Sequence, residues 1–187
     1  MAIRVLSNNL TGKLLENIKA NASKKLLVGI RDPEVATYGM YLEYGWVQRV
    51  TPKQNAWLNA QLGTNYKFST LSNPPRPFMR ATFAQKNREW AELFKAQLIQ
   101  TQDVTKAFTT LGEIVKADIR ETIKQGGCPA GSFPKRSPLT MAMFEALGEN
   151  QKVRKIQGGE SLPNNTTTTQ ALILNGKLFA SIDMKVI

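Results

Sequence analysis

The chain has 187 residues, of which 42% are hydrophobic, so it is long enough for one domain with a core and too apolar for a disordered chain. It carries 25 basic and 14 acidic side chains, and its net charge is +11. A folded protein with this balance is expected to lie near polyanions or acidic partners, the alternative being an ordinary solvated surface. No apolar run approaches the ~18 residues of a membrane helix, and the N-terminus lacks the apolar stretch of a secretory signal, so we expect a protein made and kept in a cytosol, without membrane contact.

The residue types argue against catalysis. The sequence has no histidine, which removes the usual general base and the usual metal ligand. Its one cysteine, Cys128, lies in a loop-like stretch, and we interpret it as a tolerated thiol because a nucleophilic cysteine needs an activating base. Glu113, Asp118 and Glu121 share one predicted helix with basic residues between them, which indicates ion pairs on a wet surface. We therefore expect neither an enzyme nor a bound cofactor or metal.

The first part of the chain is predicted to form short helices and strands. Residues 10–22 repeat leucine and isoleucine at spacing four, which predicts an amphipathic helix. Residues 25–31 alternate in the manner of a strand. Asp32 followed by Pro33 predicts the start of a second helix, which ends at Gly45. The apolar side predicted for this helix carries Val35, Tyr38, Tyr41 and Leu42.

After a short predicted strand over residues 46–50, the pattern becomes irregular. Residues 51–62 are predicted to form a polar turn with a small apolar patch, and residues 63–75 a loop that closes in Asn-Pro-Pro.

Two long helices are predicted in the middle of the chain. The first runs from Arg76 to about Gln100, and the second from Asp103 to Lys124, followed by two glycines. The predicted buried side of the first helix carries Met79, Phe83, Trp90, Phe94 and Leu98. The second helix has a regular apolar stripe of Val104, Phe108, Leu111, Val115, Ile119 and Ile123.

The last part of the chain is predicted to contain a short helix, a mobile loop and a strand. Ser137 caps the helix and Pro138 lies in its first turn, residues 148–170 form the loop, and residues 182–186 alternate as a strand. The sequence therefore predicts a single α+β domain over residues 1–187. Two long helices would pack on a small, mostly antiparallel sheet, with extended loops or arms.

Basic residues form several clusters. Lys116, Arg120 and Lys124 step by four and are predicted to form one basic ridge on a helix. The other clusters are Lys24 with Lys25, Arg49 with Lys53, and Lys135 with Arg136. These residues would face either DNA or acidic neighbouring proteins. A channel through which DNA slides would have to bind it weakly, because each phosphate contact adds affinity and friction.

Four short motifs occur in an order that resembles a known family. They are the EYG motif (Glu43, Tyr44 and Gly45), the RPFM motif (Arg76, Pro77, Phe78 and Met79), the SPxT motif (Ser137, Pro138 and Thr140) and a closing motif (Gly176, Leu178, Ser181 and Ile182). Together they resemble the tail-completion or neck proteins of long-tailed bacteriophages, including the minor tail protein Z type. Leu174 and Asn175 stand where the family pattern has Asp-Thr. Residues 51–75 form a long link before Arg76, which for a member of this family implies an arm that reaches a neighbouring molecule.

This resemblance implies a structural role in the virion. Such proteins form a ring at the head–tail junction, assembled in the host cytoplasm, and the genome passes through the ring. The implied partners are copies of the chain itself, the head connector or portal-side adaptor, the tail terminator or tail tube, and genomic DNA in the lumen. The alternative is a stand-alone basic module that binds nucleic acid through the basic ridge.

Overall fold

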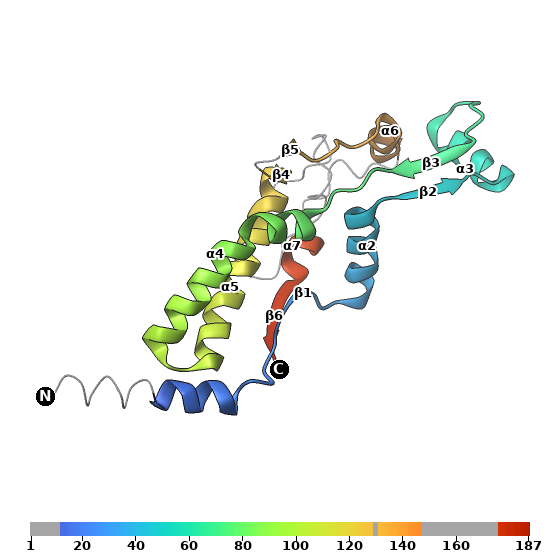
Figure 1. Cartoon of the computed structure of the whole chain (residues 1–187). Helices are drawn as coiled ribbons and strands as arrows, with labels where there is room; N and C mark the ends of the chain where they lie inside the picture. Colours follow the sequence, from blue (N-terminus) through green and yellow to red (C-terminus); the bar gives the residue numbers. More distant parts are fainter. Residues whose placement is uncertain (1–11, 129–130, 147–175) are drawn as a thin grey trace, which may run out of the picture.

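The computed structural model describes residues 12–128, 131–146 and 176–187, and it has the α+β architecture that the sequence predicts (Figure 1). The helices are α2 (Pro33–Tyr44), α3 (Pro52–Leu62), α4 (Phe78–Thr101), α5 (Val104–Gln125), α6 (Pro138–Ala146) and α7 (Lys177–Ser181), besides a helix over residues 12–20. The strands are β1 (Leu26–Ile30), β2 (Trp46–Arg49), β3 (Thr70–Asn73), β4 (Gly127–Cys128), β5 (Gly131–Ser132) and β6 (Ile182–Val186). The loop predicted at residues 148–170 lies outside the described residues. In the described part, no helix is both long and apolar enough to cross a membrane.

The strands form three separate two-stranded antiparallel sheets, β1 with β6, β2 with β3 and β4 with β5. In the first sheet Leu26 is opposite Val186, so the last residues of the chain pair with its first strand. This sheet packs on α5. Gly112 of α5 permits the close approach, because a Cβ atom there would lie 2.9 Å from Leu26 Cδ1 and 3.0 Å from Met184 Cγ.

The core lies where α5 meets α4, α2 and the C-terminal elements. The stripe predicted on α5 is confirmed, since Val115, Ile119 and Ile123 are buried in the main cluster and Val104 is buried at the start of the helix. Residues from the other elements complete the cluster: Leu42, Phe78, Trp90, Leu178 and Ile182. Two long helices held by one such stripe provide a rigid body.

The buried side predicted for α4 is partly wrong. Trp90 is buried, but Phe83 is 60% exposed, and the fully buried positions at the start of the helix are Phe78 and Thr82. Thr82 takes a core position because its hydroxyl has partners: it donates to Phe78 O (2.6 Å) and lies 2.8 Å from Thr122 Oγ1 on α5. The start of α4 therefore packs on α5 through Phe78 and Thr82, and Phe83 lies outside this contact.

Residues 51–62 form helix α3 where a turn was predicted. Thr51 and Gln54 make a capping box: Thr51 Oγ1 accepts from Gln54 N (3.2 Å), and Gln54 Oε1 accepts from Thr51 N (2.9 Å). Pro52 occupies the first turn, and Gly63 ends the helix with φ of 61°. Residues 46–75, hereafter the arm, comprise β2, α3 and β3 and project away from α4 and α5 in Figure 1.

The two short helices near the N-terminus bury less than their patterns predict. In α2, Leu42 is buried, whereas Tyr38 and Tyr41 are about half exposed. In the helix over residues 12–20, Leu15 is 51% exposed, and the helix is instead attached through Asn17, whose Oδ1 accepts from the Val104 amide at 3.0 Å. Both helices lie at the edge of the core, so part of each apolar face remains open.

Replacing Ile123 with alanine should test the core. The side chain is fully buried, so Ile123→Ala is expected to lower the free energy of unfolding by about 2–5 kcal/mol. Ile99→Ala is the matched control, because Ile99 is 59% exposed on α4 and its loss should cost less than about 0.5 kcal/mol. Urea denaturation of the two variants measures the difference, and equal losses would contradict this core assignment.

Candidate functional site

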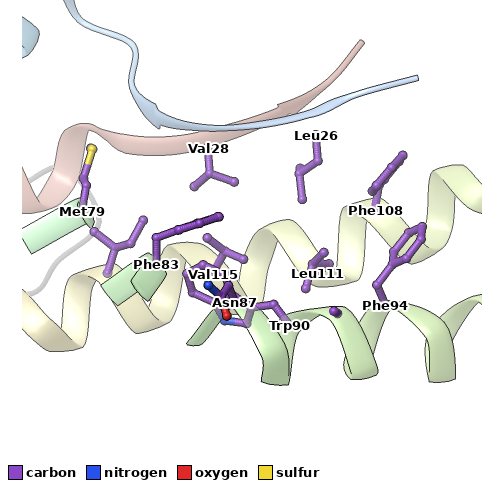
Figure 2. Close-up of a pocket in the computed structure, with 12 residues that line it drawn as sticks. Leu26, Val28, Met79, Phe83, Asn87, Trp90, Phe94, Phe108, Leu111 and Val115 are labelled. Carbon is purple, nitrogen blue, oxygen red and sulfur yellow. The ribbon is translucent and has the colours of Figure 1, made fainter. Parts of the chain in front are cut away.

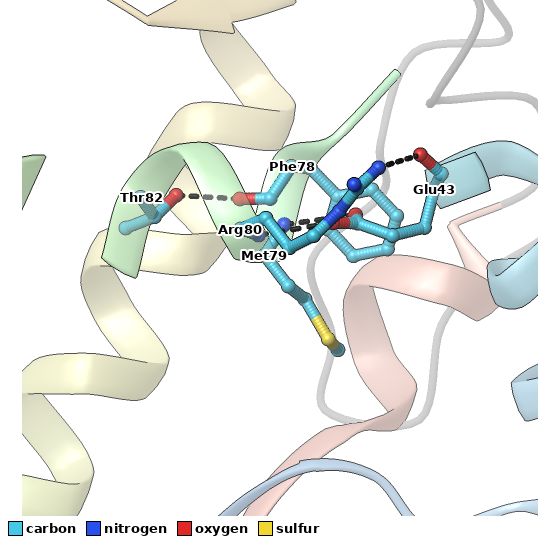
Figure 3. A network of polar contacts seen from close by, with 5 residues as sticks. All are labelled: Glu43, Phe78, Met79, Arg80 and Thr82. Carbon is cyan, nitrogen blue, oxygen red and sulfur yellow. Dashed lines mark hydrogen bonds and ion pairs between the residues drawn. The ribbon is translucent and has the colours of Figure 1, made fainter. Parts of the chain in front are cut away.

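The carboxylate of Glu43 caps the N-terminus of α4. Its Oε2 accepts from the Met79 amide (3.0 Å), and its Oε1 accepts from the Arg80 amide and from Arg80 Nε (both 3.0 Å), as Figure 3 shows. The residue preceding α4, Pro77, provides no side-chain cap, so the start of this helix depends on Glu43 of α2. A negative charge at this position is also favoured by the helix dipole.

The EYG and RPFM motifs make further contacts around this cap. The Arg76 amide donates to Leu42 O at 2.7 Å, and Arg80 Nη2 donates to Glu43 O at 2.8 Å. The Arg80 guanidinium lies 4.4 Å from the centroid of the Tyr44 ring. Gly45 has φ of 70°, and a Cβ there would lie 2.6 Å from Asn73 O, so the chain leaves α2 by a path that only glycine tolerates. The two motifs thus form one unit, although the arm separates them in sequence.

Arg76 links this unit to the SPxT motif. The side chain is buried, with Nε donating to Pro134 O (2.7 Å), Nη2 to Lys135 O (3.0 Å) and Nη1 to Asn73 Oδ1 (2.6 Å). Burial lowers the pKa of Arg76, an effect that Tyr38 opposes, but a guanidinium stays charged at any ordinary pH. Carbonyl groups therefore stabilise the buried charge of Arg76, and through these bonds Arg76 holds the segment that leads into α6.

The SPxT and closing motifs are also structural. Ser137 Oγ accepts from the Thr140 amide at 3.1 Å, which confirms the predicted cap of α6. Leu178 and Ile182 are buried in the core. Ser181 Oγ donates to Leu178 O at 2.8 Å and so closes the single turn of α7. Where the residues of the four motifs are described, their hydrogen bonds and packing hold neighbouring segments together, and Glu43, Tyr44, Phe78 and Met79 also line an open pocket of about 370 Å³.

The residues of the predicted basic ridge contact other residues of the same chain. The Lys116 side chain is only 17% exposed and contacts Glu113 (2.5 Å). Arg120 donates to Phe179 O (3.1 Å) and to Ile182 O (3.0 Å), and Lys124 Nζ lies 5.3 Å from the Phe179 ring centroid. The spacing of four does place the three residues on one side of α5, but that side faces α7 and β6.

The carboxylates of α5 serve different partners. Glu113 forms the expected ion pair with Lys116. Asp118 does not: its Oδ2 accepts from Trp90 Nε1 at 2.7 Å, which satisfies the one polar group of a buried ring. Glu121 accepts from Gln125 at 2.9 Å. The interpretation of all three as members of surface ion pairs was therefore wrong for two of them.

The remaining basic clusters separate into buried and exposed members. Arg136 is buried, and burial lowers its pKa, while Lys24 Nζ donates to Thr105 Oγ1 at 2.5 Å. Four residues of these clusters are exposed: Lys25, Arg49, Lys53 and Lys135. Sequence reasoning missed a further exposed cation on the arm, Lys67. The signal that could have found it is the absence of acidic residues throughout the arm.

An apolar groove of about 530 Å³ opens between β1 and the pair α4–α5. Figure 2 shows Leu26 and Val28 pointing from β1 toward aromatic side chains of both helices. The rings of Phe94 and Phe108 stack with centroids 4.7 Å apart. Asn87 is the one residue of the lining with a polar side-chain amide, and the lining contains no acid–base pair. In the part of the chain that the structure describes, no group of three or more His, Cys, Asp or Glu residues is placed to hold a metal.

Comparisons of the chain with protein-family models, with curated proteins and with solved structures found no match.

Removing the carboxylate of Glu43 should uncouple α2 from α4. Glu43→Ala leaves the amides of Met79 and Arg80 without their acceptor, and we expect a loss of about 2–3 kcal/mol in the free energy of unfolding. Glu92→Ala is the control, because that side chain is 78% exposed on α4 and its contact with Lys95 is 4.0 Å long. Chemical denaturation measures both; a loss no larger in Glu43→Ala than in the control would show that the cap is dispensable.

Proposed function

We propose that the chain is a structural subunit of a phage neck, a ring-forming adaptor of the tail-completion or collar type that joins the head connector to the tail and surrounds the DNA channel. The observation that supports this most is the junction of motifs. Glu43 of the EYG motif caps the helix that the RPFM motif begins, and Arg76 holds the segment before the SPxT motif. Because these motifs contact one another in the fold, they form one structural unit. This supports the interpretation that the motifs resemble those of the family and do not match them by chance.

The arm suits a protein that works in an assembly. All four residues of β2 are exposed, and Val47 is 76% exposed. A two-stranded ribbon of this kind is marginally stable by itself, and it gains stability when a neighbour covers it. Head-to-tail contacts between identical subunits close into a ring, and they require no catalytic group.

The stand-alone nucleic-acid-binding module receives less support. Its expected surface was the ridge of Lys116, Arg120 and Lys124, and these side chains contact other parts of the same chain. Arg120 would have to release the C-terminal elements that it holds before it could contact DNA, which leaves Lys124 as the exposed residue of the ridge.

Complementation of a phage whose copy of this gene is disrupted tests the proposal. The intact chain should restore infectious particles, and cryo-electron microscopy should show it as a ring between the head connector and the tail. Glu43→Ala should restore few particles, because an unfolded junction yields no ring, whereas Glu92→Ala should complement fully. Mature virions that lack the chain would refute a neck function.

A further inference from the structure

The acidic residues of the chain are unevenly distributed. Residues 44–88 contain no aspartate or glutamate, although the whole chain has 14. The same stretch contains seven basic residues: Arg49, Lys53, Lys67, Arg76, Arg80, Lys86 and Arg88. Arg76 is buried and Arg80 pairs with Glu43, so the exposed charge of the arm comes from Arg49, Lys53 and Lys67.

These three cations lie at the outer part of the arm. Arg49 is the last residue of β2, Lys53 is in the first turn of α3, and Lys67 lies between α3 and β3. Val50 N donates to Ser69 O at 3.0 Å, which brings the two sides of the arm together at this level. Within the described residues none of the three cations forms an ion pair.

The outer part of the arm is held in shape by two asparagines of α3. Asn59 Oδ1 accepts from Tyr66 N (2.8 Å), and its Nδ2 donates to Tyr66 O (2.9 Å). Asn55 Oδ1 accepts from Phe68 N at 3.0 Å. The segment that carries Lys67 is therefore fixed against α3, and its charge is presented at a defined place.

Exposed aromatic rings accompany the cations. Trp57 is 52% exposed on α3, and Tyr66 is 65% exposed next to Lys67. Cations with no carboxylate nearby to repel phosphate favour contact with the backbone of nucleic acid, and the exposed rings add contact area beside them. We define the arm tip as Arg49, Lys53, Trp57, Tyr66 and Lys67.

We propose that the arm tip is the surface through which this chain contacts DNA, by neutralising backbone phosphates without reading the sequence. The inference rests on the proposed function, in which that DNA is the genome in the channel of the ring. With about three phosphate contacts per subunit, the isolated chain should bind weakly, and the logarithm of its affinity should fall with the logarithm of salt concentration with a slope near −3. Each contact is weak by itself and does not depend on the base sequence, so DNA of any sequence can pass along the arm tips.

The test measures binding of the full chain to a short fluorescent DNA duplex by anisotropy between about 50 and 200 mM salt. The triple variant Arg49→Ala, Lys53→Ala, Lys67→Ala should lose most of the affinity at low salt and most of the slope. The matched control is Lys13→Ala, Lys19→Ala, Lys106→Ala, which removes the same charge from exposed positions outside the arm. It should retain more than half of the slope.

Several results would overturn the inference. Equal losses in the two triple variants would show that the binding comes from net charge alone. An unchanged slope in the arm-tip variant would place the DNA surface elsewhere. Displacement of DNA by polyglutamate at equal charge concentration would identify an acidic protein as the better partner. Urea denaturation verifies folding, because exposed substitutions should leave the midpoint unchanged.

The two proposals fail in different experiments. If the arm-tip variant binds DNA with the same salt dependence as the intact chain, and the chain is present in the virion neck, only the DNA surface is refuted. Absence of the chain from virions refutes the neck function, whatever the isolated chain binds.

Discussion

The fold depends on one carboxylate placed between two helices. Glu43 is buried at the end of α2, and the charge of its side chain is acceptable there because two amides and a guanidinium surround it. Between α2 and α4 the chain leaves the core, forms the arm and returns. Closing such an excursion costs conformational entropy, so contacts at its base must offset that cost. The cap on α4, the bond from the Arg76 amide to Leu42 O and the sharp exit at Gly45 all lie at this base.

Arg76 connects the base of the arm to the segment before α6. A buried guanidinium has five donors, and those of Arg76 engage carbonyls of the segment before α6 and the amide side chain of Asn73. Phe78, two residues later, is fully buried. A polar network that must be fully satisfied contributes little net stability, but it penalises other arrangements. The junction therefore fixes where the arm leaves the body, while the α5 stripe supplies most of the apolar burial.

Local patterns predicted the elements that depend on local contacts. The α5 stripe, the caps at Asp32 and Ser137 and the pairing strand at the C-terminus all follow from residues near one another in sequence. The capping box of α3 was equally local, and it was overlooked because the helix has no clear apolar face. Long-range partners could not be predicted in this way. No residue near Asp118 in the sequence indicates that its partner is Trp90. The spacing of Lys116, Arg120 and Lys124 predicts that they share one side of α5, but it does not predict the carbonyl groups that Arg120 contacts there.

These contacts distinguish the body of the molecule from the arm. In the body, the buried and half-buried charges named above have partners within the chain: amides for Glu43, carbonyls for Arg76 and Arg120, and an indole for Asp118. The arm has no carboxylate to pair with its own cations, and strand β2 is exposed along its whole length. Uncompensated positive charge on the arm of one copy repels the same charge on the arm of another copy. In the proposed ring, several arms brought close together would therefore repel one another, and a polyanion such as DNA between them would offset that repulsion.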